Sequence, residues 1–250
     1  IYKFFLKNIS MKKKLYTAIG LMSGTSMDGV DLSIISSDGY EEFSNIFDEY
    51  YEYDKNLQNQ LVRLRDLIST KKDLSQNSEK IRELERDLTL FHAYAINQSI
   101  KKYKDPIDLV GFHGQTILHK TREKITKQLG DGKLLSQITK KKVVYDFRNA
   151  DVKNNGQGAP LTPVFHYILS KKIQSNFNIE FPIGFLNIGG IANVTKVSKI
   201  SDKIQNNLSA HDIGPGNCLI DEWVRKNSYK KFDKNGDLAK TGRVNQLILN

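Results

Sequence analysis

The fold is decided by Ile19-Gly-Leu-Met-Ser-Gly-Thr-Ser-Met-Asp-Gly-Val-Asp-Leu-Ser-Ile-Ile35. Two apolar runs, Tyr16 to Met22 and Val30 to Ile35, flank a short polar tip that contains two glycines. Apolar runs on either side of a glycine-rich tip are typical of a β-hairpin. The stretch therefore predicts two strands joined by a tip that can approach a ligand closely.

The tip has the composition of a phosphate-binding loop. We expect Gly24 and Gly29 to take positive φ and to bring the backbone close to a phosphate, with the serine and threonine hydroxyls as further donors. Asp28 repels a phosphate unless a divalent cation or a water lies between them, which suggests a magnesium nucleotide. An ordinary Gly/Ser hairpin turn explains the stretch equally well when it is taken alone.

Composition narrows the class of protein. The chain has 250 residues, of which 39% are hydrophobic and 26% charged, and no apolar run approaches the length of a membrane span. The net charge of +10 comes from 38 basic residues, but only 8 of these are Arg and the lysines are scattered. We therefore expect a soluble, cytoplasmic protein without a nucleic-acid or membrane partner. Cys218 is the only cysteine, which excludes disulfides within the chain and cysteine-rich metal sites.

Residues 1–10 do not read as a signal peptide, because lysines interrupt their apolar cluster and no small-residue cleavage site follows. We expect Met11 to be the natural start. The glycine and proline density of Asn154 to Pro163 predicts a crossover between domains. The predicted division is 11–150 for a first domain with the hairpin and 151–250 for a second.

Helices and strands alternate after the hairpin. A 3.6-residue period predicts a core-facing helix from Ser78 to Tyr103, within which His92 is a packed or surface histidine rather than a ligand. The other expected elements are strand-like 41–53, a helix over 56–67, a strand over 107–112, a helix over 133–140, a strand over 142–145 and a helix over 164–172.

Polar residues follow two of these strands. His113 and Gln115 come directly after one, and Asp146 and Arg148 come after the other; ligands of α/β folds bind at such strand ends. Arg148 can pair a carboxylate or a phosphate, or it can bridge to a neighbouring aspartate. His113 can be a ligand-binding group or merely order its loop, and His119 is expected to be exposed.

The second half repeats the opening pattern. A strand from Ile183 to Ile188, the pair Gly189-Gly190 and a strand from Ile191 to Val197 predict another glycine-tipped hairpin. Asp212 follows in a predicted glycine loop, and a helix is expected to begin at Cys218. Two such halves suggest a nucleotide held between two similar lobes. Neither a Walker A motif nor a Gly-x-Gly-x-x-Gly motif after a strand occurs.

Six motifs together resemble the anhydro-N-acetylmuramic acid kinase family, from about Tyr16 to the end of the chain. They are Gly20-Leu-Met-Ser-Gly-Thr-Ser-Met-Asp-Gly-Val-Asp31, His113-Gly-Gln-Thr116, Asp146-Phe-Arg148, Gly156-Gln-Gly-Ala-Pro160, Asn187-Ile-Gly-Gly-Ile-Ala-Asn-Val-Thr195 and Asp212-Ile-Gly-Pro-Gly-Asn217. The resemblance implies an α/β fold of two lobes with related ribonuclease-H-like topology, as in acetate and sugar kinases, the heat-shock chaperone ATPase and actin, with a nucleotide cleft between them.

The resemblance also implies a reaction. A water opens the 1,6-anhydro bond of anhydro-N-acetylmuramic acid, and O6 takes a phosphoryl group from ATP, giving N-acetylmuramic acid 6-phosphate in murein recycling. Asp212 would be the base that deprotonates the water, or alternatively part of the shell of Mg²⁺. Asp28 would lie near Mg²⁺ through water, and the protein would be a homodimer.

The remaining roles implied by the resemblance fall into three groups. The ATP phosphates would be bound by Gly24, Thr25, Ser26, Met27, Asp28, Gly29, Val30 and Asp31. The nucleotide side of the cleft would be formed by Asn187, Gly189, Gly190, Asn193, Gly214, Gly216 and Asn217. The sugar side would be formed by His113, Gln115, Asp146 and Arg148.

The chain departs from the family pattern in places. Ile213 replaces the common threonine after the catalytic aspartate, and Asn154-Asn155 replaces paired glycines. Family members continue beyond Asn250, so the second lobe is expected to be incomplete at its C-terminus. Two alternatives remain: a kinase or phosphatase of the same fold group for another acceptor, and a catalytically inactive remnant.

Overall fold

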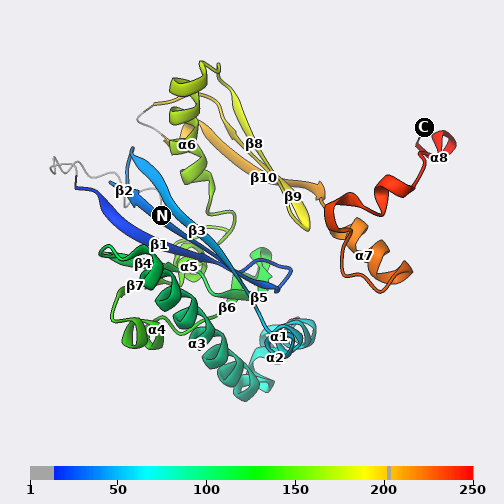
Figure 1. The fold of residues 1–250 in the computed structure, drawn as a ribbon, viewed down its shortest axis with the longest axis horizontal. Coiled ribbons are helices and arrows are strands. Elements are labelled where there is room, and N and C mark those ends of the chain that lie inside the picture. Colours follow the sequence, from blue (N-terminus) through cyan, green and yellow to red (C-terminus); the bar gives the residue numbers. More distant parts are fainter. Residues whose placement is uncertain (1–13, 202–203, 250) are drawn as a thin grey trace. The chain divides into compact units, whose positions relative to one another are not determined.

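The computed structural model describes residues 14–201 and 204–249; the expectations for residues 1–10 and for Met11 lie outside these ranges. Contacts between Cα atoms divide the chain into two compact units, residues 1–161 and 162–250 (Figure 1). The sequence placed this division at residue 150, and the contacts place it after Leu161, just before a helix begins. Each unit is described below by itself.

The first unit is a mixed α/β structure. Its strands are β1 (Tyr16–Met22), β2 (Gly29–Ser37), β3 (Phe43–Glu52), β4 (Leu109–Phe112), β5 (Gln115–Lys120), β6 (Ile125–Leu129) and β7 (Lys142–Tyr145). Its helices are α1 (Lys55–Leu67), α2 (Lys71–Gln76), α3 (Ser78–Tyr103), η1 (Thr121–Glu123), α4 (Gly132–Thr139) and α5 (Phe147–Lys153).

Five strands of this unit form one sheet in the order β3-β2-β1-β4-β7. β2 is antiparallel to both of its neighbours, whereas β4 is parallel to β1 and β7 is parallel to β4. β5 and β6 form a separate antiparallel pair. The predicted opening hairpin is confirmed, since Met22 pairs with Asp31 at its tip end.

The helix that packs most extensively in this unit is α3, whose bounds agree with the prediction. Ile81, Leu84 and Leu88 recur at spacings of three and four residues and are buried, so one face of the helix joins the core. His92 lies on that face and is fully buried, as expected of a packed histidine. Asp131 caps α4 by accepting the backbone N–H groups of its first turn.

The second unit has its own sheet. Its elements are α6 (Pro163–Phe177), β8 (Ile183–Ile188), β9 (Ile191–Val197), η2 (Ile204–Asn206), β10 (Leu208–Pro215), α7 (Cys218–Asn227), η3 (Lys234–Gly236), η4 (Ala239–Thr241) and α8 (Gln246–Leu249). The strands pair antiparallel in the order β10-β9-β8, and α6 packs against β9 and β10 (Figure 1). The predicted second hairpin is confirmed.

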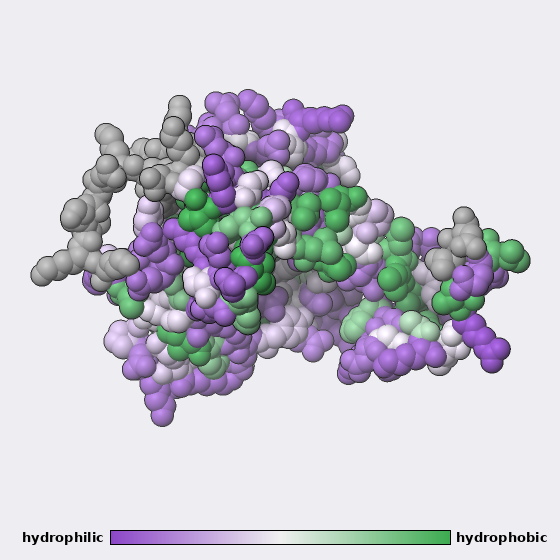
Figure 2. All heavy atoms as spheres, turned by 90° about the horizontal axis from the view of Figure 1, so that it is seen from above, coloured by the Kyte–Doolittle hydropathy of each residue, from purple (hydrophilic) through white to green (hydrophobic). Residues whose placement is uncertain are grey.

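Many apolar side chains of the second unit remain in contact with solvent. Leu219, Ile220 and Trp223 of α7 are each more than half exposed. Figure 2 shows hydrophobic surface over the C-terminal part of the chain. Among the described residues, no helix combines the length and the apolar character needed to cross a membrane.

Two local predictions are wrong, and one helix was not predicted. Ala210 to Asn217 is not a loop throughout, because β10 continues to Pro215 and carries Asp212 within a strand. The residues after β7 form a helix, α5, which the sequence did not indicate because its polar residues lack an apolar period. His119 is half-buried on β5, where its Nδ1 lies 3.1 Å from the Thr126 hydroxyl.

Candidate functional site

The candidate site residues of the first unit gather at one edge of its sheet. β1, β4 and β7 are parallel, and Leu21, Phe112 and Tyr145 lie in register across them. Because the carboxyl ends of parallel strands meet at the same edge, the tip after β1, His113 after β4 and Asp146 after β7 share that edge. Topology thus brings together residues from three distant parts of the sequence.

The tip is a β-turn with one buried anchor. The Met27 N–H donates to the Gly24 carbonyl at 3.2 Å, which places Thr25 and Ser26 at the exposed corners. Positive φ was expected at Gly24 and Gly29 but occurs at Met27, where φ is 54°. Positive φ costs a bulky residue of order 1–3 kcal/mol in free energy. The Met27 side chain, however, is only 1% exposed and packs in the core. Its burial offsets the strain by a similar amount.

Gly29 is required by close packing. A Cβ at this position would lie 2.4 Å from the Tyr51 carbonyl oxygen and 2.5 Å from the Tyr50 hydroxyl. Burial, followed by the negative charges of Asp28, Glu52 and Asp31, raises the pKa of Tyr50 to about 12. The phenol therefore stays protonated and donates to Asp28. The Ser26 hydroxyl also donates to the Asp28 carboxylate, at 2.6 Å. Asp28 is itself exposed.

A buried polar network lies beneath the tip. The Ser23 hydroxyl donates to Gln115 Oε1 at 2.5 Å and lies 2.8 Å from the Tyr53 hydroxyl. Gln115 Nε2 donates to the Gly24 carbonyl at 3.0 Å. Ser23, Gln115 and Tyr53 are 2%, 1% and 4% exposed, so these hydrogen bonds are shielded from water. The tip is therefore held by side chains from the ends of β1, β3 and β5.

His113 and Arg148 form a second cluster at the same edge. Arg148 Nε donates to His113 Nε2 at 2.7 Å, and its Nη1 donates to the Gly158 carbonyl at 2.8 Å. His113 Nε2 is therefore an acceptor, and Nδ1 carries the proton toward the Gly114 carbonyl, 2.6 Å away. Burial, and then the nearby Arg148 charge, lower the pKa of His113 to about 4. His113 thus holds the Arg148 guanidinium by accepting a hydrogen bond from it.

The alternative in which Arg148 bridges to a neighbouring aspartate is not observed. The Asp151 carboxylate accepts the Gly158 N–H at 2.8 Å, and a Cβ on Gly156 would lie only 2.1 Å from Asp151 Oδ2. Asp146 accepts from the Asn149 side chain at 2.6 Å. Both carboxylates are therefore engaged within their own loop, and Arg148 has neutral partners.

In the second unit, three predicted residues form a row across the sheet. Asn187 on β8 pairs with Asn193 on β9, and Asn193 pairs with Asp212 on β10. Directly opposed residues of antiparallel strands project to the same face. Asn187 and Asp212 are exposed and Asn193 is half-buried, so the row presents a carboxylate and two amides toward solvent.

The glycines of the second unit hold two turns together through backbone contacts. The Gly216 N–H donates to the Gly190 carbonyl at 2.9 Å, and the Asn217 N–H donates to the Gly189 carbonyl at 2.8 Å. A Cβ on Gly216 would lie 2.0 Å from the Gly189 oxygen, so only glycine fits there. Gly214 takes φ 150° next to an irregularity in the pairing of β10, close to Asp212.

Comparison with known proteins identifies the family. Residues 16–250 match the profile of the anhydro-N-acetylmuramic acid kinase family. This chain belongs to that family. The protein named anhydro-N-acetylmuramic acid kinase of Pelagibacter ubique is 53% identical over 238 residues, which cover 95% of this chain and 62% of the relative.

Two other relatives with the same name are more distant. That of Agrobacterium fabrum is 42% identical over 91% of this chain and 60% of its own length. That of Rhizobium johnstonii is 40% identical, with the same two coverages of 91% and 60%. The chain thus spans about three fifths of the length of these anhydro-N-acetylmuramic acid kinases.

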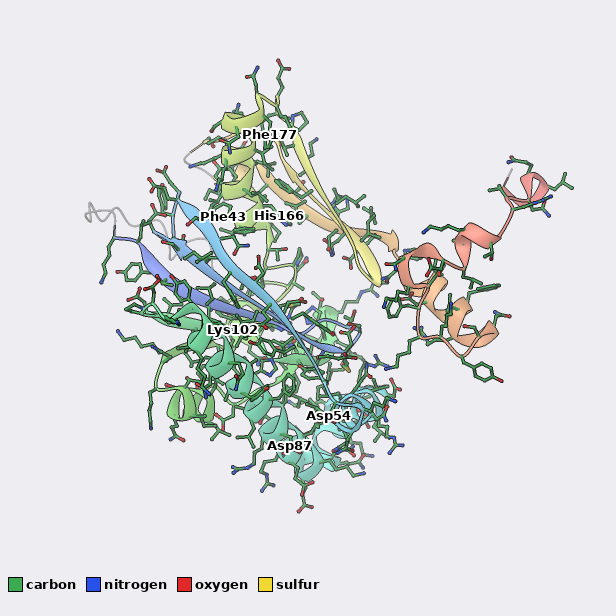
Figure 3. The ribbon with its side chains drawn as sticks, in the orientation of Figure 1. Phe43, Asp54, Asp87, Lys102, His166 and Phe177 are labelled. Carbon is green, nitrogen blue, oxygen red and sulfur yellow. The ribbon has the colours of Figure 1, made fainter. Side chains whose placement is uncertain are left out.

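Sequence reasoning missed several side chains that shape this family member's site. Tyr50 and Tyr53 were read only as part of a strand-like segment, and Ser23 only as a hydroxyl donor. His166 of α6, labelled in Figure 3, lies 2.9 Å from the Thr195 hydroxyl and stacks on the Phe185 ring at 4.7 Å, beside the row that holds Asp212. A histidine at a helix start carries no signal of this contact, which depends on the packing of α6 on the sheet.

Proposed function

We propose that this protein is an ATP-dependent kinase that hydrolytically opens 1,6-anhydro-N-acetylmuramic acid and phosphorylates its O6. The family match over residues 16–250 carries the proposal. Water forms a bond to the anomeric carbon, the bond from that carbon to O6 breaks, and O6 takes the γ-phosphoryl group of ATP. The products are N-acetylmuramic acid 6-phosphate, ADP and a proton.

The tip of the first hairpin suits the phosphates of ATP. Its corner residues Thr25 and Ser26 are exposed; the Thr25 hydroxyl is a donor there, whereas the Ser26 hydroxyl donates to Asp28. The Gly24 carbonyl is turned toward Gln115. Because the Gly24 carbonyl, a hydrogen-bond acceptor, is held away from the corners of the turn, hydrogen-bond donors are left there to contact an anion. Together with Met27, Gly29 and Val30, these residues would bind the β- and γ-phosphates.

The donor set also suits Mg²⁺. Asp28 and Asp31 are carboxylates near each other, and both are accessible to solvent. Partial burial of the Asp31 carboxyl group, followed by the negative charge of Asp28, raises the pKa of Asp31. Mg²⁺ prefers oxygen ligands and retains several waters, so Asp28 would hold it through water. When bound, Mg²⁺ neutralises charge on the transferring phosphoryl group.

Asp212 is proposed as the general base. Its carboxylate lies at the solvent end of the row with Asn193 and Asn187, where the two amides can fix the position of a water or a sugar hydroxyl. Gly189, Gly190, Gly214, Gly216 and Asn217 support this row and would line the nucleotide side. In the competing role, Asp212 joins the shell of Mg²⁺.

Arg148 is proposed to face the acidic sugar. Among the described residues its Nη2 has no hydrogen-bond partner, while Nε and Nη1 are fixed by His113 and Gly158. A guanidinium held in this way is ready to pair a carboxylate. Asp146 and His113 would complete the sugar side by positioning neighbouring groups.

The two units are proposed to be the lobes of a ribonuclease-H-like ATPase fold with ATP between them. In support, β8-β9-β10 repeats the antiparallel order of β1-β2-β3, with a glycine tip in the first hairpin of each unit. A cytoplasmic homodimer is proposed on the family resemblance.

A coupled assay of ADP release with ATP, Mg²⁺ and anhydro-N-acetylmuramic acid tests the function. We expect Asp212→Asn to lower kcat roughly a hundredfold or more, because a general base contributes this much. Asp87→Asn, an exposed aspartate of α3, is the matched control and should retain full activity (Figure 3). Unaltered turnover in Asp212→Asn would remove the assignment, and a raised Mg²⁺ requirement would instead favour the metal role.

A further inference from the structure

Gln115 has no group left to offer a sugar. It is the first residue of β5, is 1% exposed, and reaches across more than ninety residues of sequence to the tip of the first hairpin. Its Oε1 accepts the Ser23 hydroxyl, and its Nε2 donates to the Gly24 carbonyl and, at 3.4 Å, to the Thr116 carbonyl. All three contacts are made within the protein.

The network fixes the direction of every proton in it. Gln115 Oε1 can only accept, so the single Ser23 proton points to Gln115 at the shorter distance of 2.5 Å. The Tyr53 hydroxyl must then donate to Ser23 Oγ at 2.8 Å. Burial is the main cause of a raised pKa of Tyr53, so the phenol keeps the proton that it donates.

The same residues control the backbone of the tip. The Gly24 carbonyl that Gln115 holds also accepts the Met27 N–H that closes the turn. The Tyr53 N–H donates to the Asp28 carbonyl at 2.8 Å. Carbonyls at the start and at the end of the tip are therefore tied to buried groups.

Because the peptide unit is planar, fixing the Gly24 carbonyl also fixes the direction of the Thr25 N–H. The C=O of one residue and the N–H of the next point in opposite directions across a planar trans peptide. Because Gln115 fixes the Gly24 carbonyl on the protein side, the Thr25 N–H points away from it, on the side of the exposed Thr25 and Ser26 side chains. The donors are thus oriented before any ligand arrives, which avoids the entropy cost of ordering them on binding.

We propose that Gln115, acting with Ser23 and Tyr53, is a positioning residue that holds the phosphate-binding tip in its binding conformation, and that it does not contact the sugar. Only glutamine provides both a donor and an acceptor at this reach, since glutamate lacks the donor and asparagine is shorter. The structural part stands on the contacts alone, and the kinetic part rests on the proposed kinase function.

Hydrogen exchange of the free protein tests the structural part. In Gln115→Ala we expect the amides of Met27 and Tyr53 to exchange about tenfold faster or more, while those of α3 are unchanged. Gln128→Ala is the matched control, because among the described residues the Gln128 side chain donates only to the Thr116 and Thr126 hydroxyls, and it should leave Met27 and Tyr53 as in the wild type. Equal exchange in Gln115→Ala and wild type overturns the proposal.

Gln115→Glu covers the possibility that the alanine variant fails to fold. Glutamate keeps the size and the acceptor for Ser23, but donates to the Gly24 carbonyl only when it is protonated. Burial disfavours the charged carboxylate and so raises the pKa of a glutamate at this position. Relative to wild type at each pH, Met27 should therefore exchange faster at pH 8 and approach the wild-type rate at pH 5. A ratio independent of pH and equal to one overturns the proposal.

Steady-state kinetics separate positioning of the tip from sugar binding. Gln115→Ala should raise the KM for ATP about tenfold and leave the KM for anhydro-N-acetylmuramic acid within about twofold. A rise confined to the sugar KM overturns the proposal and makes Gln115 a sugar ligand. If the wild type turned over no ATP, the proposed function would fall, while the exchange experiment would still decide the role of Gln115.

Discussion

The two glycine-tipped hairpins look alike in sequence but are held by different forces. The tip of β1 and β2 rests on a buried side-chain network of Ser23, Gln115 and Tyr53. The tip of β8 and β9 is fastened by backbone hydrogen bonds from Gly216 and Asn217.

The two tips show two ways of fixing a turn, one through buried side chains and the other through backbone hydrogen bonds. In the first unit, buried side chains orient the backbone of the tip. In the second, backbone contacts leave polar side chains such as Asn187 and Asp212 free at the surface. Removing a side chain should therefore damage the first tip, and adding one should damage the second.

The largest effect is expected from acid, through a fully buried histidine of the first unit. Burial lowers the pKa of His92 from 6.5 to about 4, so between these pH values the unfolded chain binds a proton that the folded chain does not. Stability contributed by neutral His92 is present above pH 6.5 and is lost as pH falls toward 4, by about 3 kcal/mol. Urea unfolding at pH 7 and pH 4 measures this loss.

His92→Leu should remove the His92 share of the pH dependence, because the buried position then has nothing to protonate. The share of His113, whose pKa is also lowered to about 4, should remain. His211→Leu, at an exposed histidine of the second unit, is the control and should keep the full dependence. Identical losses in the wild type and in His92→Leu would show that other groups cause the acid sensitivity.

Gly216→Ala should have the next largest effect, this time in the second unit. The added Cβ would lie 2.0 Å from the Gly189 oxygen, and relieving this overlap should cost about 2 to 3 kcal/mol. Fluorescence of Trp223, the single tryptophan, reports unfolding of this unit. Gly184→Ala has open space around its Cβ and should change stability by less than about 0.5 kcal/mol. Equal stabilities of the two variants would contradict the backbone fastening.

Ser23→Ala should cost about 2 kcal/mol in the first unit, because it leaves the Tyr53 hydroxyl and Gln115 Oε1 buried without their partner. Circular dichroism during urea unfolding measures the loss. Ser33→Ala on the same hairpin removes a bond to Asp48 at the surface and should have little effect. A loss no larger than that of Ser33→Ala would mean that the network does not stabilise the tip.

Tyr53→Phe should have the smallest effect, about 1 kcal/mol. It removes one donor from the network but retains the ring, which packs edge-on against Phe91 at 4.9 Å. Thermal unfolding is the measurement, with Tyr94→Phe, an exposed tyrosine, as the control. A destabilisation greater than that of Ser23→Ala would reverse the order of importance within the network.

Periodicity and turn chemistry predicted most elements correctly. The bounds of α3 and of the hairpin strands follow from apolar spacing and from the glycine tips. α5 was missed because its sequence, Phe147 to Lys153, has too few apolar residues to show a helical period. β10 was read as a loop because its glycines and Pro215 are typical of turns, although its ladder continues through them.

The site was predictable only as a set of residue types. Gly24 was expected to supply the positive φ, but Met27 takes it because its side chain gains burial in the core. The network of Tyr53 with Ser23 and Gln115 depends on the register of three strands, which local sequence does not encode.

The net charge of the His113–Arg148 pair at the sheet edge does not change with pH over a wide interval. With the pKa of His113 near 4, the histidine is neutral throughout the mildly acidic and neutral range, whereas the guanidinium keeps its proton at every physiological pH. The cluster therefore carries one positive charge over this whole interval. The affinity for an acidic ligand bound there would vary with pH only through the ionisation of the ligand, because the charge of the His113–Arg148 pair stays constant.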